Sequence, residues 1–282
     1  MQADSYLIAD SGSTKTDWVL KSPEGECSFQ SAGINPFYQT AEEIIPVLEK
    51  EVLPNLTWPV GKIYFFGAGC ADEQSSRPVF EALTKCIATA GTIEIASDML
   101  GAARGLCGHE PGLACILGTG ANNAYYDGEN IVRSIGSLGF WLGDEGSGSH
   151  LGKTLVVHFL QNELPEHLHL KFAAQFPEVH RLSVLDNAYK KPYPNRYFAS
   201  FSKFIALNRE EPFLETLVYH AFTLFTEKYI SKHQEAQSVP IHFTGSIAFY
   251  YQDILKSVLE KKGLKPGRIL KSPLEGLLLY YS

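Results

Sequence analysis

Short apolar runs that end on small and polar residues recur along the chain of 282 residues. Tyr6 to Ala9 is apolar and is followed by Asp10 and the turn Ser11 to Thr16. Ala114 to Leu117 is also apolar and is followed by the turn Gly118 to Gly120. A buried strand that ends in such a turn presents backbone N–H groups to a bound phosphate. The repeated design predicts two similar half-molecules.

Each of the two turns leads into a further strand and a hairpin. In the first copy the strand is Trp18 to Leu20 and the hairpin turn is Pro23 to Gly25. In the second copy the hairpin turn is Asp127-Gly128. Other short apolar runs predict strands at Ile63 to Phe66, Ile93 to Ala96, Ile241 to Phe243 and Arg268 to Leu270.

Apolar residues at a spacing near 3.6 predict helices between these strands. A capping box of Thr40 and Glu43 predicts a helix toward Leu53, which Pro46 should kink or shorten. Further helices are predicted over Ser76 to Ala90, Met99 to Leu106, Ile247 to Lys261 and Leu274 to Tyr281. Strands that alternate with helices in this way indicate an α/β fold.

A long segment in the second half is largely helical. It begins with a helix capped by Ser147 or Ser149 and continues to His233. We interpret it as a helical insertion that covers the second sheet.

Composition narrows the class of protein. With 45% hydrophobic and 20% charged residues, the chain resembles an ordinary folded protein, and no apolar run approaches the roughly 20 residues of a membrane span. The apolar start lacks a preceding basic region, so we expect a cytoplasmic protein with no membrane partner. The net charge of −7 disfavours nucleic acid as a partner. Five cysteines without a CxxC spacing argue against disulfides and against a zinc ribbon.

Polar residues follow several of the predicted strands, where open α/β sheets place their ligands. Asp10 follows the first strand, and Ser97-Asp98 follows Ile93 to Ala96. Either aspartate could instead cap a turn or a helix, and Asn35 before Pro36 could be only a turn former.

The loop Gly139 to Lys153 contains five glycines around the acidic pair Asp144-Glu145. An acidic pair on a solvated loop usually has no functional role. So many glycines beside Phe140 and Trp141 indicate a tightly constrained loop, which favours a functional role.

Five motifs occur in one order from end to end of the chain: DSGSTKTDW, the Ser97-Asp98 pair, ILGTGAN, LGDEGSG and FTGSIAFYY. Together they resemble the sugar kinase, Hsp70 and actin superfamily. Within it they resemble the N-acetylglucosamine kinase and BadF/BadG/BcrA/BcrD ATPase family.

The resemblance implies two ribonuclease H-like (actin-like ATPase) domains with ATP and Mg²⁺ in the cleft between them. The N-terminal domain would cover residues 1–112. The C-terminal domain would cover residues 113–270, with the helical insertion at about 150–235. The C-terminal helix, about 271–282, would pack back on the N-terminal domain.

The resemblance also implies roles for individual residues. Asp98 would be the catalytic base, and Asp10 would organise Mg²⁺ through water. The nucleotide would be bound by Gly12, Ser13, Thr14, Lys15, Gly118, Thr119, Gly120, Gly245 and Ser246. The sugar would be bound by Asn35, Asn122 and Asp144. Two departures from the family pattern, Ala121 for serine and Phe140-Trp141 for Trp-Gly, bear on the choice of sugar.

The expected function is transfer of the γ-phosphoryl group of ATP to a hydroxyl of an amino sugar, N-acetylglucosamine or a close relative. Phosphoryl transfer needs backbone donors, a metal carboxylate and a base, and the motifs supply all three. The particular sugar and hydroxyl stay open, as does the oligomeric state, for which a homodimer is one option.

Two alternatives share the fold. One is the activator ATPase of a 2-hydroxyacyl-CoA dehydratase, but no cysteine follows Cys115 to ligate its iron–sulfur cluster. The other is a sugar or nucleotide sensor without catalysis, against which the presence of both Asp10 and Asp98 weighs.

Overall fold

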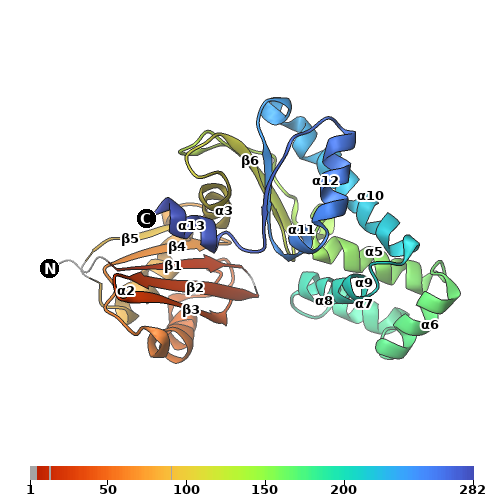
Figure 1. Ribbon diagram of the computed structural model, residues 1–282. Helices are drawn as coiled ribbons and strands as arrows, with labels where there is room; N and C mark the ends of the chain where they lie inside the picture. The colour runs from red at the N-terminus through yellow and green to blue at the C-terminus, as the bar shows by residue number, and fades with distance from the viewer. Residues whose placement is uncertain (1–4, 13, 90) are drawn as a thin grey trace. The chain divides into compact units, whose positions relative to one another are not determined.

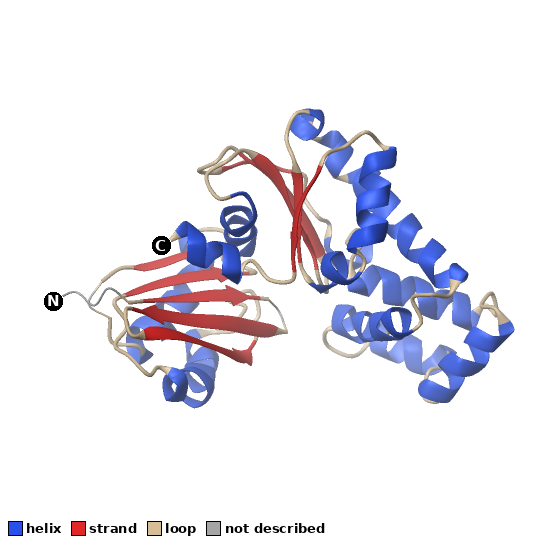
Figure 2. Cartoon of the chain, in the orientation of Figure 1, coloured by secondary structure: helices blue, strands red, loops and turns tan. Residues whose placement is uncertain are grey.

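The computed structural model describes residues 5–12, 14–89 and 91–282. The chain divides into two compact units (Figure 1). The first contains the described residues up to Glu110, together with Tyr126–Ile131 and Ser272–Ser282. The second contains Pro111–Tyr125 and Val132–Lys271. Each unit has a five-stranded sheet with helices packed on it, which confirms the α/β fold (Figure 2).

The two sheets have the same strand order. The first is β3-β2-β1-β4-β5, and the second is β8-β7-β6-β9-β10 when followed in the same sense. The strands of the first are β1 (Tyr6–Ser11), β2 (Lys15–Ser22), β3 (Gly25–Ala32), β4 (Lys62–Gly67) and β5 (Ile93–Ser97). Those of the second are β6 (Gly112–Leu117), β7 (Ala121–Tyr126), β8 (Ile131–Ser134), β9 (Ile241–Thr244) and β10 (Pro266–Leu270). The prediction of two similar half-molecules is therefore confirmed.

Strand β1 is apolar on both faces because both are covered by helices. Leu7 and Ala9 belong to a core cluster with residues of α1 and α2, whereas Ile8 packs with Phe66 and with Leu277 of the C-terminal helix. The strand extends two residues beyond the predicted end at Ala9. Its last residue, Ser11, is fully buried. Burial of the polar side chain is possible because its hydroxyl forms hydrogen bonds with Thr16 Oγ1 (2.6 Å) and the Ile34 carbonyl (2.8 Å).

The helix after Thr40 is interrupted as Pro46 predicts. It runs as α1 (Ala41–Val47), then as a π-helix (Leu48–Val52) and a 3₁₀ turn (Leu53–Asn55). The change follows Pro46 directly, because proline has no N–H for the α-helical ladder.

Helix α2 (Glu73–Cys86) differs at both ends from the predicted Ser76 to Ala90, of which Ala90 lies outside the described residues. It starts earlier because the Asp72 carboxylate accepts the Ser75 N–H at 2.8 Å and caps it. It ends earlier because the following chain turns extended and Thr89 forms a parallel bridge with Val60.

Helix α3 (Asp98–Cys107) begins at the N-cap Ser97, and α13 (Leu274–Tyr280) packs on it. The contact is very close, since a Cβ on Gly276 would lie 1.8 Å from the Gly105 carbonyl oxygen. Two glycines at this crossing let the C-terminal helix reach the first unit.

The second unit holds the long helical segment, and Ser147 rather than Ser149 caps the helix over Gly148–Leu160. The helices are α4 (Gly139–Leu142), α5 (Gly148–Leu160), α6 (Glu166–Gln175), α7 (Arg181–Tyr189), α8 (Pro194–Ser200), α9 (Ser202–Leu207) and α10 (Pro212–Lys228). Two 3₁₀ turns follow, at Ile230–Lys232 and Gln234–Gln237.

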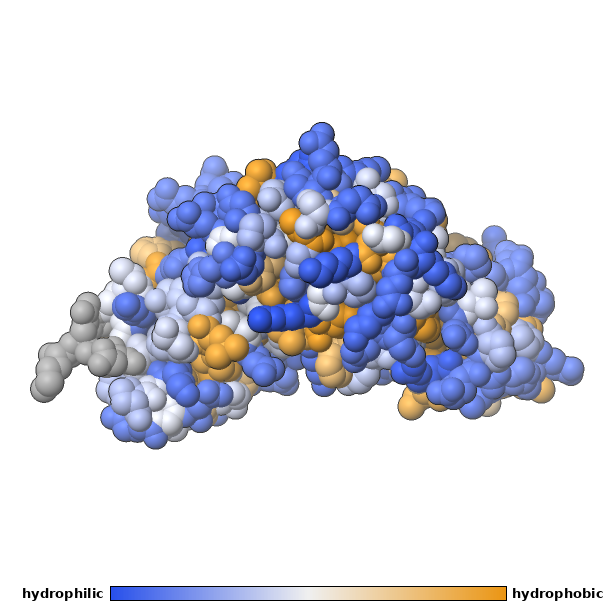
Figure 3. Space-filling model, turned by 45° about the horizontal axis from the view of Figure 1, so that its top comes forward, coloured by the Kyte–Doolittle hydropathy of each residue, from blue (hydrophilic) through white to orange (hydrophobic). Residues whose placement is uncertain are grey.

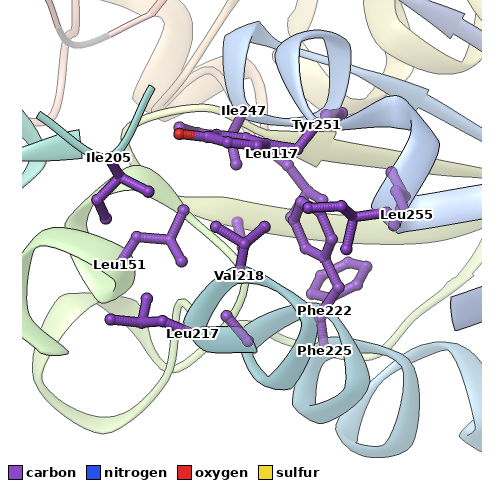
Figure 4. Close-up of a cluster of buried hydrophobic side chains, with 14 of the residues drawn as sticks. Leu117, Leu151, Ile205, Leu217, Val218, Phe222, Phe225, Ile247, Tyr251 and Leu255 are labelled. Atoms are coloured by element: carbon purple, nitrogen blue, oxygen red, sulfur yellow. The ribbon is translucent and has the colours of Figure 1, made fainter. Parts of the chain in front are cut away.

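The predicted helix Ile247 to Lys261 is wrong in one respect, because it is broken into α11 (Ser246–Tyr250) and α12 (Gln252–Lys261). The break is at Tyr251, which leaves helical geometry (φ −117°, ψ 29°) and is only 2% exposed. Figure 4 shows its ring in the apolar cluster that α5, α9, α10 and α12 form with Leu117 of β6. Burial of this ring accounts for the bend.

Among the described residues, no helix is both long and apolar enough to cross a membrane. The face of the surface seen in Figure 3 is largely hydrophilic, with apolar residues in separate groups.

Candidate active site

One edge of the first sheet carries the predicted site residues of this unit. Strand β2 is antiparallel to β1 and β3, and β4 and β5 are parallel to their neighbours. Strands β1, β3, β4 and β5 therefore end at the same edge. Asp10, the loop after Ala32, the turn after Gly67 and Asp98 all lie there.

The carboxyl group of Asp10 is in an unfavourable environment for a negative charge. Its pKa is raised to about 7, first by burial and then by the charges of Asp98 and of Asp17, which stands opposite in the β1–β2 register. Lys15 and the Ser272 hydroxyl, 3.5 Å from Asp10 Oδ2, oppose the shift. A cation would relieve this cost.

Burial also raises the pKa of Asp98, to about 6, although the Met99 N–H favours the carboxylate. Asp98 opens α3, where the helix dipole also favours negative charge. At neutral pH the group is ionised but much more basic than an ordinary aspartate, as a general base requires.

The environment of Asp10 fits a magnesium ion bound through water. Mg²⁺ takes oxygen ligands, uses one or two carboxylates and usually keeps several waters. In the part of the chain that the structure describes, no three His, Cys, Asp or Glu residues are grouped to hold a metal directly. A carboxylate with excess negative charge around it, as at Asp10, suits such an ion.

The first glycine turn joins β1 to β2. The Gly12 N–H donates to the Lys15 carbonyl at 3.0 Å, and the Gly33 N–H donates to the Thr14 carbonyl at 3.3 Å. The Lys15 ammonium is 2.7 Å from an oxygen of Asp17. Of the predicted phosphate-binding residues, Ser13 lies outside the described residues.

The second glycine turn is held by the start of α5. Gly148 N–H donates to the Gly118 carbonyl (2.8 Å), and Ser149 N–H donates to the Thr119 carbonyl (3.1 Å). A Cβ on Gly118 would meet nothing within 4 Å, whereas one on Gly120 would lie 3.1 Å from Asp144 Oδ2. One side of the turn is therefore open and the other faces a carboxylate.

Asp144 lies against this turn in a constrained conformation. It is 8% exposed and has φ 60°, which is unusual for a residue with a Cβ. Its Oδ1 accepts hydrogen bonds from Ser137 Oγ (2.7 Å) and from the Ala121 N–H (3.2 Å). Local strain of this kind recurs at functional sites.

The neighbouring Glu145 has a structural task that the sequence analysis missed. Burial would raise its pKa, but hydrogen bonds from Lys228 and from Tyr229 Oη (2.5 Å) lower it below the usual value. These bonds join the acidic loop to the end of α10. Nothing local in the sequence signals them, since the partners are 83 and 84 residues away.

The two asparagines of β7 differ. Asn123 is buried and bonds the Ile135 carbonyl (2.9 Å) and His233 Nε2 (2.7 Å), so it supports the fold. The predicted sugar ligand Asn122 is half-buried, and its Oδ1 accepts the Asn123 N–H at 2.9 Å.

The third glycine turn, Thr244 to Ser246, packs against the second, Gly118 to Gly120. Gly245 has φ +109°, and a Cβ on it would lie 2.4 Å from the Leu117 carbonyl oxygen, so only glycine fits. Ser246 follows at the start of α11 and is exposed.

Asn35 forms a turn at the edge of the first sheet. Its Oδ1 accepts the Phe37 N–H at 2.9 Å, and its own N–H donates to Gln39 Oε1 at 2.8 Å. Asn35 therefore forms a turn, as the sequence analysis allowed.

The predicted site residues form one group in each unit. In the first, the edge of the sheet gathers Asp10, Gly12, Thr14, Lys15, Asn35 and Asp98. In the second, the turns after β6 and β9, the start of β7 and the loop before α5 carry Gly118, Thr119, Gly120, Asn122, Asp144, Gly245 and Ser246.

Neither a protein-family model nor a curated protein matches the sequence. Among solved structures, the putative N-acetylglucosamine kinase from Porphyromonas gingivalis is 41% identical over 98% of both chains, with a TM-score of 0.93. The putative N-acetylglucosamine kinase from Chromobacterium violaceum is 17% identical over 100% of both chains (TM-score 0.73). The ROK family glucokinase from Streptomyces griseus, in complex with glucose and AMPPNP, is 14% identical over 98% of this chain and 97% of its own (TM-score 0.57).

At 17% and 14% identity, the second and third similarities establish only a common fold. The first establishes kinship along nearly the whole chain. The chain therefore belongs to the N-acetylglucosamine kinase family of the sugar kinase, Hsp70 and actin superfamily.

Proposed function

We propose that the protein transfers the γ-phosphoryl group of ATP to a hydroxyl of an amino sugar, N-acetylglucosamine or a close relative. The observation that carries the proposal is the pair Asp10 and Asp98, two carboxyl groups of raised pKa at one edge of one sheet. One suits a cation, and the other suits a proton acceptor. Together they supply two of the parts that phosphoryl transfer needs.

Asp98 accepts the proton of the sugar hydroxyl as that oxygen attacks phosphorus. Its pKa of about 6 leaves it ionised at pH 7 and close enough to the working pH for efficient proton transfer. The Met99 N–H holds the carboxylate at the start of α3.

Asp10 would hold Mg²⁺ through water. The ion would neutralise the negative charge of the phosphate oxygens. Gly12, Thr14, Lys15 and the undescribed Ser13 are assigned to the phosphates, as are Gly118, Thr119 and Gly120. Gly245 and Ser246 are assigned to the nucleoside. The AMPPNP bound to the Streptomyces griseus glucokinase, which has the same fold, supports ATP as the donor.

Asn35, Asn122 and Asp144 are assigned to the sugar. The bonds from Ser137 and Ala121 hold the Asp144 carboxylate in one orientation before substrate arrives. Such preorganisation lowers the entropic cost of binding a hydroxyl.

The test is an ADP-coupled assay over N-acetylglucosamine, glucosamine, N-acetylmannosamine, N-acetylmuramic acid and glucose, with the product mapped by ³¹P and ¹³C NMR. We expect the highest kcat/KM with N-acetylglucosamine. ATP binding without phosphorylation of any of these sugars would refute the proposal.

A further inference from the structure

A pocket in the first unit has no role in the chemistry above. It has a volume of about 500 Å³ and lies between the segment 36–42 and α2, where Gln74, Arg77 and Glu81 line it. Small-molecule sites commonly have volumes of about 300 to 1,000 Å³. The pocket is therefore large enough for a ligand.

Two aromatic rings line the pocket and face solvent. Phe37 is 76% exposed and Tyr38 59% exposed, with ring centroids 4.9 Å apart and planes at 79°. Large aromatic side chains exposed as a group commonly mark a binding surface. Flat rings of this kind can stack on the C–H face of a sugar.

Hydrogen bonds to Asn35 hold the backbone of the segment that carries these rings. The Phe37 N–H donates to Asn35 Oδ1 (2.9 Å), and the Tyr38 N–H donates to the Asn35 carbonyl (3.0 Å). Behind the turn, a Cβ on Gly69 would lie 2.4 Å from Asn35 Oδ1, so the two loops are in close contact. Rings on a preorganised turn bind with a smaller entropic cost.

The pocket adjoins the segment that leads away from the Asp10 edge of the same sheet. Ser11, next to Asp10, donates from its hydroxyl to the Ile34 carbonyl (2.8 Å), and its own carbonyl accepts the Ala68 N–H (2.9 Å). The pocket begins at Pro36, one residue after Asn35. A substrate that reaches Asn35 would thus extend naturally toward the pocket.

The charge of the pocket argues against an anionic ligand. Its ionisable residues are two carboxylates, Glu42 and Glu81, and one guanidinium, Arg77, whose Nε is 2.7 Å from Glu81. The resulting net charge of −1 disfavours phosphate groups and anionic lipid. Amide and carboxylate groups beside aromatic rings suit the hydroxyls and C–H face of a sugar.

We propose that this pocket is a second sugar subsite, which binds a glycosyl residue attached to the amino sugar that is phosphorylated. The inference rests on the proposed function, and it widens the substrate class from an amino monosaccharide to an amino-sugar disaccharide.

Isothermal titration calorimetry with N-acetylglucosamine and with N,N′-diacetylchitobiose, its β-1,4-linked dimer, tests the subsite directly. We expect the wild type to bind the dimer about tenfold more tightly than the monomer. Tyr38→Ala and Gln74→Ala, one on each wall, should abolish that preference and leave the monomer affinity unchanged. Both leave the Asn35–Phe37 turn intact, and thermal unfolding verifies that the variants fold.

The matched control is Phe80→Ala. Phe80 is also exposed and stands on α2, but it does not line the pocket, so its removal should leave the preference for the dimer unchanged. Three results would overturn the subsite. The wild type could bind dimer and monomer equally, Phe80→Ala could lose the preference for the dimer as Tyr38→Ala and Gln74→Ala do, or the latter two variants could lose monomer affinity as much as dimer affinity. If the dimer is preferred but neither sugar is phosphorylated, the proposed activity fails and the subsite stands.

Discussion

Replacement of Asp10 by Asn should stabilise the metal-free protein. The pKa of Asp10 is raised from 3.8 to about 7 by burial and by the charges of Asp98 and Asp17. In the unfolded chain the group ionises with its ordinary pKa, so above pH 7 the folded state bears the cost of an ionised carboxylate that is largely withdrawn from water. Asparagine has nearly the same shape and no charge, and it removes this cost.

The size of the gain follows from the shift. Each pKa unit corresponds to about 1.4 kcal/mol, and a shift of about 3 units gives about 4 kcal/mol as an upper value. Because the folded-state pKa is raised, wild-type stability is highest at low pH and falls as pH rises from 3.8 to about 7. The gain in Asp10→Asn should follow the same curve, being small near pH 4 and full at pH 8.

The assay is urea unfolding of wild type and Asp10→Asn in EDTA at several pH values, repeated with Mg²⁺ and ATP. Ligand should stabilise the wild type more than the variant, because the variant lacks the metal carboxylate. Glu73→Gln is the control for net charge, since Glu73 is exposed in the same unit. A loss of stability in Asp10→Asn, or a gain independent of pH, would refute the reasoning.

Three further outcomes are expected. Asp98→Asn should retain sugar and nucleotide affinity by calorimetry but lower kcat by about 10² to 10⁴-fold. The kcat of the wild type should decline as pH falls through about 6, because Asp98 then becomes protonated. Near-normal turnover in Asp98→Asn would show that Asp98 only begins its helix. Asp144→Ala should raise the sugar KM by about 10- to 150-fold with little change in nucleotide affinity, and a collapse of nucleotide binding alone would reassign the loop. Tyr251→Phe should stabilise the protein by about 1 kcal/mol in urea unfolding, since the buried Tyr251 hydroxyl has no hydrogen-bond partner among the described residues, and a clear loss would contradict this.

Local pattern was sufficient for the strands and for several caps. Tyr6 to Ala9 and Ala114 to Leu117 are strands because short apolar runs closed by glycine turns suit a buried sheet. Pro46 interrupts α1, and Ser147 caps α5, through effects that act within four residues.

Element ends were less predictable where distant contacts decide them. Helix α2 stops at Cys86 because Thr89 pairs with Val60, and the last long helix breaks at Tyr251 because its ring enters the core. Helical propensity near these positions differs by tenths of a kcal/mol, which a buried ring or a backbone bridge easily outweighs.

The sequence by itself therefore determined the duplicated α/β plan, the order of the motifs and the residue types offered at the strand ends. Only the tertiary structure decided which of those groups meet. Ser272 reaches Asp10 across 262 residues, and Glu145 is held by Lys228 and Tyr229 from the end of α10. The raised pKa values of Asp10 and Asp98 likewise depend on burial and on charges brought together by folding. Burial and Coulomb interactions depend on distance in space, whereas a sequence records only distance along the chain.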